Sequence, residues 1–123
     1  MAKNVILLNK GDSYNFEVGI VNETYPDQLY FLTENDIVYF GLMYPHSDFE
    51  DACLLKMYTK KDMDNCGVIT VKINPNDTKD LQVGVYYYTV KLQQNVDPKT
   101  EACDLSKGKI STVIQRTKFI IME

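Results

Sequence analysis

Apolar and polar residues alternate with a period of two along most of the chain, which predicts β-strands rather than helices. The clearest alternation lies in residues 13–21, where one face of the predicted strand carries Tyr14, Phe16, Val18 and Ile20. The positions between them are polar or glycine. This pattern is typical of an antiparallel strand with one face buried and the other in water.

Similar patterns predict further strands, separated by turn residues. They fall at residues 5–8, 36–45, 53–59 and 68–73, at Tyr86–Leu92 and in the final stretch 110–123, with a short edge strand at 29–32. The phase of the final strand shifts near Gln115 and Arg116, which indicates a β-bulge. A loop is expected at 95–109. Seven to eight short strands without a convincing helix predict an all-β sandwich or small barrel, formed as a single domain over residues 1–123.

The alternation also assigns side chains to faces. The expected inward sets are Val38, Phe40 and Leu42; Cys53, Leu55 and Met57; and Ile69, Val71 and Ile73. The segment 36–45 is apolar on both faces. Ile37, Tyr39 and Met43 are therefore expected on a second surface, which is open to cover by something else.

The stretch "DTKDLQVGVYYYTV", residues 77–90, combines a polar turn, a leucine, a glycine and three consecutive tyrosines. Asp77 and Thr78 are expected to bond free N–H groups at the start of a single helical turn that crosses between two sheets. Gly84 permits a sharp bend. Tyr86 then occupies the position of a tyrosine corner, its hydroxyl bonded to upstream backbone, which predicts an immunoglobulin-like antiparallel β-sandwich. Tyr87 is expected to point outward.

Charge argues against one class of partner. The formal net charge is −4, whereas a nucleic-acid-binding surface needs a positive footprint. Residues 1–98 hold 8 basic and 14 acidic residues, a balance of −6, and residues 99–123 hold 5 and 3, a balance of +2. Such polarity assists head-to-tail contacts between copies; an uneven solvated surface is the plainer interpretation.

Candidate chemistry is sparse. The three cysteines lie far apart without a CxxC pair, so neither a disulfide framework nor a zinc site is expected. The N-terminal apolar run, Val5 to Leu8, is shorter than a signal peptide or a membrane span requires. We therefore expect synthesis in a cytoplasm and no membrane partner.

No catalytic motif accompanies His46, the single histidine, so we expect a surface loop there and no enzyme activity. Asp62 and Asp64 resemble the start of a calcium loop, but Ile73 stands where the bidentate acid belongs. A hairpin turn is expected instead, with a weak cation site left open. No cofactor and no metal are expected.

The nine tyrosines and the absence of tryptophan direct attention to binding. Exposed tyrosines supply rigid contact area and are enriched in protein interfaces. The candidates for such an interface are Tyr39, Tyr44, Tyr58 and Tyr87. Ordinary exposure on strands is the alternative for each of them.

Four segments together resemble the immunoglobulin-like β-sandwich domains of phage tail and baseplate proteins, such as the N-terminal domain of the baseplate upper protein. The segments are "GDSYNFEVGI", "TENDIVYFGL", "INPNDTKDLQVGVYYYTVKL" and "ISTVIQRTKFII". The matching positions are Gly11 and Asp12; Asp36, Val38 and Phe40; Asp77, Thr78, Leu81, Gly84, Tyr86 and Tyr88; and Thr112, Val113 and Phe119.

The resemblance implies a virion structural protein that binds other virion subunits, as a homo-oligomer, in a tail, baseplate or capsid surface. Proteins of that kind usually continue into coiled-coil or receptor-binding regions, whereas this sequence ends at Glu123. We therefore expect a small accessory virion subunit. The alternative is a small acidic intracellular protein that binds and modulates a host protein.

Overall fold

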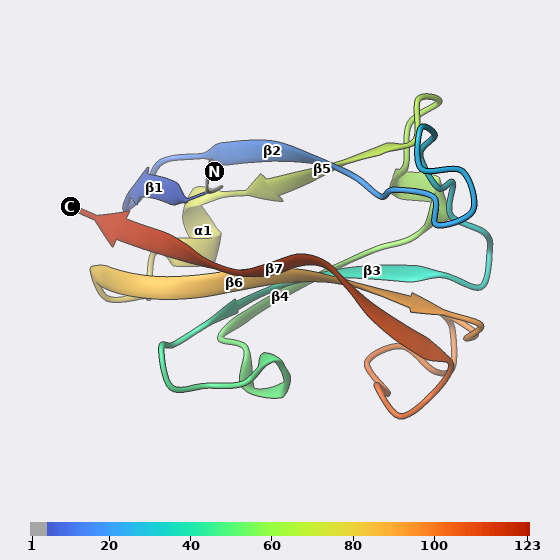
Figure 1. Ribbon diagram of the computed structural model, residues 1–123. Coiled ribbons are helices and arrows are strands. Elements are labelled where there is room, and N and C mark those ends of the chain that lie inside the picture. The colour runs from blue at the N-terminus through green and yellow to red at the C-terminus, as the bar shows by residue number, and fades with distance from the viewer. Residues whose placement is uncertain (1–4) are drawn as a thin grey trace.

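A computed structural model describes residues 5–123 and shows an all-β fold of two facing sheets (Figure 1). The larger sheet has the strand order β1-β7-β6-β3-β4, and the smaller sheet pairs β2 with β5. The strands are β1 (Ile6–Asn9), β2 (Tyr14–Gly19), β3 (Ile37–Met43), β4 (Leu54–Tyr58), β5 (Val68–Ile73), β6 (Gly84–Gln94) and β7 (Lys109–Met122). Three single turns of helix join them: η1 (Phe49–Asp51), η2 (Lys60–Asp62) and α1 (Pro75–Thr78).

The main core lies between the sheets and is rich in aromatic side chains. Tyr88 of β6 is its centre: its ring lies 5.8 Å from that of Phe16, 5.7 Å from Phe40 and 6.3 Å from Phe119, measured between ring centroids. Phe16 belongs to the small sheet and the other rings to the large one. Burial of these large side chains is the main favourable contribution to sheet packing.

Most inward faces follow the sequence alternation. The predicted sets of β2, β3, β5 and β6 all contribute to this core. The crossing from β5 to β6 also agrees: α1 joins the two sheets, and the Tyr86 hydroxyl donates a 2.6 Å hydrogen bond to the Gln82 carbonyl. Asp77 accepts a 2.7 Å bond from the Asn74 N–H at the start of α1. The Thr78 hydroxyl, in contrast, is buried without a partner in the described chain, so the predicted second cap is wrong.

The inward set predicted for residues 53–59 is right at Cys53, which packs on the core just before β4, but has the wrong phase within the strand. Leu54 pairs with Leu42 and Tyr58 pairs with Val38, and cross-strand partners share a face. Leu54 and Tyr58 therefore pack on the core. Leu55 and Met57 are 41% and 47% exposed on the opposite face.

Two further expectations differ from the structure. Residues 29–32 form no strand, only an isolated bridge between Leu29 and Val21. The sandwich is not wholly antiparallel, because β1 pairs in parallel with the end of β7. Alternation within one strand carries no information about the direction of its partner.

The bulge predicted in the last strand is present. Tyr88 pairs with Thr117 and Val90 with Ile114, so two steps along β6 correspond to three along β7. The Thr89 hydroxyl donates a 2.6 Å bond to the Ile114 carbonyl at this point. A bulge of this kind bends the strand and increases its twist.

A second, smaller core covers the outer face of β3. Ile37 and Tyr39 pack there with Val96 of the loop between β6 and β7. The Phe49 ring lies over Gly41, where an added Cβ would come within 2.6 Å of it. The apolar outer face predicted for residues 36–45 is thus covered by the chain's own loops.

We expect Tyr86→Phe to lower the free energy of unfolding by about 0.5–1.5 kcal/mol, the usual net value of one hydrogen bond. The Gln82 carbonyl loses its 2.6 Å donor, while the buried ring remains. Urea denaturation measures the change. Tyr25→Phe, at an exposed loop position, is the control and should change stability little. Equal stability of both variants would contradict a stabilising corner.

We expect the protein to lose stability as the pH rises from 10 towards 12. Burial raises the pKa of Tyr88 from 10.0 to about 12. Below pH 10 both states keep the proton, so this group adds no pH dependence. Between these values the unfolded chain has released the proton and the folded chain retains it, so the unfolded state binds fewer protons and is favoured as pH rises.

Urea titrations at pH 8, 10, 11 and 12 check this expectation. The free energy should be flat at the lower values and fall at the higher ones. A Tyr88→Phe variant, compared at each pH, should show a weaker fall. A constant free energy up to pH 12 is the contrary result.

Candidate functional site

Tyr39 is not part of a contact surface, because its side chain is completely buried. Its hydroxyl donates a 2.6 Å bond to Gln93 Oε1 and accepts a 2.9 Å bond from the Cys103 N–H. Gln93 Nε2 in turn donates to the carbonyls of Asp104 and Lys107, at 2.8 and 3.1 Å. Desolvation raises the pKa of Tyr39, so it stays a neutral donor. This prediction fails because the β6–β7 loop folds back over β3.

Tyr44 and Tyr87 lie near each other, on either side of Arg116. The Arg116 guanidinium stacks over the Tyr87 ring at 4.8 Å and donates to the carbonyls of Tyr44, Pro45 and Ser47 at 3.1, 2.9 and 3.0 Å. Tyr87 is half-buried as a result, while Tyr44 remains exposed with its ring against Tyr86. Of these two tyrosines, Tyr44 is the one with an open aromatic surface.

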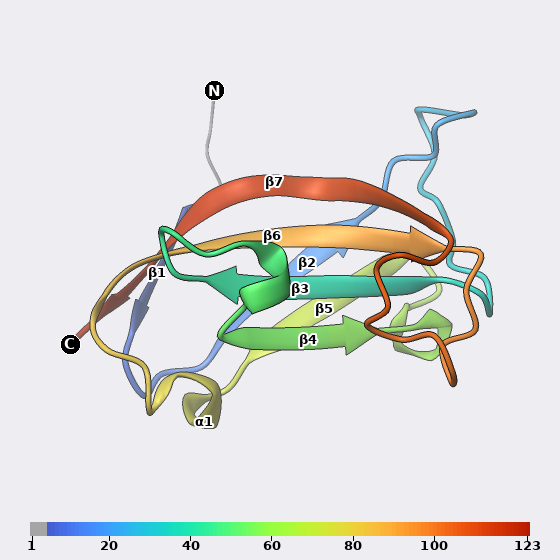
Figure 2. The same ribbon diagram turned by 90° about the horizontal axis from the view of Figure 1, so that it is seen from below.

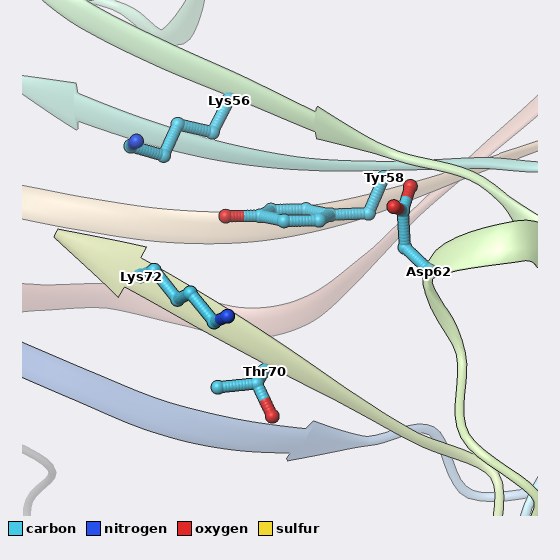
Figure 3. A pocket seen from close by; sticks show the side chains of 5 residues that line it. All are labelled: Lys56, Tyr58, Asp62, Thr70 and Lys72. Atoms are coloured by element: carbon cyan, nitrogen blue, oxygen red, sulfur yellow. The ribbon is translucent and has the colours of Figure 1, made fainter.

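Tyr58 lies in a groove between β4 of the large sheet and β5 of the small sheet. Its half-buried ring projects across the space between β4 and β5, where Lys56, Asp62, Thr70 and Lys72 line a volume of about 410 Å³ (Figure 3). Lys56 is paired with Asp77 at 2.9 Å. Desolvation raises the pKa of Tyr58. The lining carries both signs of charge, so it selects no simple anion or cation.

A second groove, of about 530 Å³, runs along the opposite side of the small sheet. Its walls are the end of β2 with the segment after it, residues 19–24, and residues 111–113 of β7. Tyr30, Leu92 and Gln94 complete the lining. The two grooves have one cause: a two-stranded sheet covers the middle of a five-stranded sheet and leaves a gap on each side.

The edge of β7 beside this groove is open. β1 pairs only with Phe119–Met122, and β6 is the other partner of β7. Residues 109–118 of β7 thus have no strand on their outer side within the described chain, and Figure 2 shows this part of β7 at the margin of the sheet. Unpaired edges present free backbone groups and are sites for strand addition.

A row of exposed apolar side chains crosses the outer face at the other end of β7. Leu7 pairs with Ile120, and Ile120 pairs with Val85, so the three side chains stand side by side on one face. Leu7 is 57% exposed and Val85 is 43% exposed. A contiguous apolar surface of this kind is typical of an interaction site.

The segments around His46 and around Asp62 and Asp64 form local turns. His46 is exposed in a turn after β3. Asp64 Oδ1 accepts from the N–H groups of Cys66 and Val68, and Asp62 Oδ2 accepts from Thr59, so both carboxylates close local turns. Among residues 5–123, no three His, Cys, Asp or Glu side chains form a cluster suited to a metal ion. No helix in that range is long and apolar enough to cross a membrane.

Comparison with protein-family models, with curated proteins and with solved structures finds no match to this chain.

Sequence reasoning missed the two residues that organise the outer face, Arg116 and Gln93. Arg116 is the single arginine of the chain and stands at the phase shift of the last strand. That coincidence was a usable signal, since a guanidinium presents five donors in a rigid fork. Gln93 stands at an outward position of its strand, and nothing in its neighbours marks it as buried.

We expect Arg116→Lys to lower the free energy of unfolding by roughly 1–2 kcal/mol, because an ammonium cannot serve three carbonyls and a ring at once. The turn at residues 44–48 should also become more accessible to protease. Lys99→Arg, an exposed loop change, is the control. Denaturation and limited proteolysis measure both effects. Unchanged cleavage of this turn would show that Arg116 does not hold it.

Proposed function

We propose that this chain is an immunoglobulin-like β-sandwich subunit of a bacteriophage virion, in the tail, baseplate or capsid surface. It acts by binding neighbouring subunits, and no bond is made or broken. The single observation that carries the proposal is the open section of β7, residues 109–118, with its adjoining groove and the apolar row beyond it. A protein with such edges needs partners that cover them.

Two features support the immunoglobulin-like part of the proposal. The small sheet pairs the second strand with the fifth, and the large sheet places the sixth strand between the seventh and third. The Tyr86 hydroxyl bonds the backbone four residues upstream, at the start of a central strand. Both are features of immunoglobulin-like sandwiches. The sequence resemblance to phage tail and baseplate domains supplies the virion context.

A second candidate is a host-protein binder synthesised in the host cytoplasm. The acidic balance of residues 1–98, −6, favours it, since a net negative charge accelerates association with a positively charged partner. The open edge serves either function. What differs is the partner: several subunits of a particle in one case and one host protein in the other.

Mass spectrometry of purified phage particles tests the proposal. We expect the chain in a fixed number of copies per particle, retained through salt washes and density-gradient purification. Absence from particles, together with a one-to-one complex with a host protein, would favour the second candidate.

A matched pair of variants tests the surface itself. Val85→Glu places a charge in the apolar row, and we expect it to fold normally but to lose most of its incorporation into particles. Tyr25→Glu, at an exposed position outside both the groove and the apolar row, is the control and should be incorporated. Normal incorporation of Val85→Glu would show that the row is not a contact.

A further inference from the structure

The two margins of the five-stranded sheet have complementary outlines. On one margin β1 covers Phe119–Met122 and leaves the preceding part of β7 open. On the other margin β4, five residues long, pairs only with β3 in the described chain. One margin therefore has a notch and the other has a short projecting strand.

The notch and β4 lie at the same position along the strand direction of the sheet. Cross-strand partners followed through β3 and β6 place Tyr58 in one row with Ser111. The same procedure places Leu54 in one row with Thr117. The strand β4 thus spans the level of residues 111–117, and β1 begins just beyond that level.

The strand directions also agree. From β7 to β4 each neighbouring pair is antiparallel, so β4 runs opposite to β7. If a second copy is placed beside the first in the same orientation, its β4 meets the open section of β7 as an antiparallel partner. Antiparallel pairing is the more stable arrangement per residue.

Charge distinguishes this arrangement from pairing of like edges. β7 carries Lys109, Arg116 and Lys118 and no acidic residue. The exposed residues just before β4 include Glu50 and Asp51. Two β7 edges brought together would place these cations against each other. In the β4–β7 arrangement the one basic residue of β4, Lys56, is already paired with Asp77, and the segment with Glu50 and Asp51 comes to the end of the pair near Lys118. Like charges at an edge discourage the first arrangement and select the second.

We propose that copies of this chain join head to tail, β4 of one copy adding to residues 111–117 of β7 in the next. The inference rests on the proposed function, because it names a second copy as the partner of the open edge. Leu55 and Met57, exposed on β4, become neighbours of the next copy's β7. Neighbouring strands turn by about 20–25°, so successive copies are rotated, and a ring or a helical filament results rather than a flat stack.

Cross-linking tests the register. Met57 and Thr112 occupy one row and are both exposed, so antiparallel partners there place their Cα atoms about 4.5–5.5 Å apart, within reach of a disulfide. The variant Met57→Cys/Thr112→Cys is made with Cys66→Ser and Cys103→Ser, because both native thiols are exposed and that of Cys103 contacts Met57 Sδ at 3.4 Å. Mild oxidation should give a ladder of covalent oligomers. Each single cysteine variant, with the same two serine changes, should give at most dimers.

A charge exchange tests the pairing without new cysteines. Lys118→Glu and Asp51→Lys should each weaken self-association roughly three- to tenfold, and the double variant should recover it. Glu17→Lys, an equal charge change on the exposed face of the small sheet, is the control. Sedimentation equilibrium measures the constants, and thermal denaturation confirms folding. Equal weakening by Glu17→Lys, or no recovery in the double variant, would overturn the proposal.

The outcomes separate this inference from the proposed function. A chain that is present in virions, yet is monomeric at high concentration and gives no ladder, would overturn head-to-tail joining and leave the virion assignment intact. A chain that forms the ladder but is absent from particles would support the inference and contradict the virion assignment.

Discussion

A small sheet of two strands faces a large sheet of five, and most of the structure depends on this mismatch. β2 and β5 cover the middle of the large sheet, where Tyr88, Phe16 and Phe40 meet. The flanks are left without a facing strand, so a groove runs along each side. Apolar surface that no second sheet covers must be covered by loops or by partners, because its exposure to water is unfavourable.

The outer face of the large sheet shows both solutions. At β3 the chain covers itself: the β6–β7 loop and Phe49 close over Tyr39, and Gln93 holds the loop carbonyls. At the bulge of β7, Arg116 ties the turn after β3 to the sheet. No loop covers the outer face at the start of β6, before Tyr87. Leu7 and Val85 of the apolar row are therefore exposed to solvent. The exposed apolar row is thus the part of the outer face that no loop of the described chain covers.

The proposed role in assembly follows from where cover is missing. Binding by strand addition needs an unpaired edge, room beside it and charges that exclude wrong partners. The margin of β7 offers the edge and an adjoining groove, and it carries basic residues, whereas acidic residues precede β4 on the opposite margin. These features support the proposed assembly with further copies of the chain.

The sequence by itself determined the strand faces of β2, β3, β5 and β6, the helical turn at α1, the Tyr86 corner and the bulge in β7. Each is set by local alternation or by turn residues within a few positions. Tertiary structure alone decided the parallel pairing of β1, the phase of β4 and the burial of Tyr39. These depend on which strand lies alongside and which loop folds back, and side-chain alternation carries no record of either. For the same reason the open margin of β7 could not be read from the chain, since an edge exists only once every strand has its neighbours.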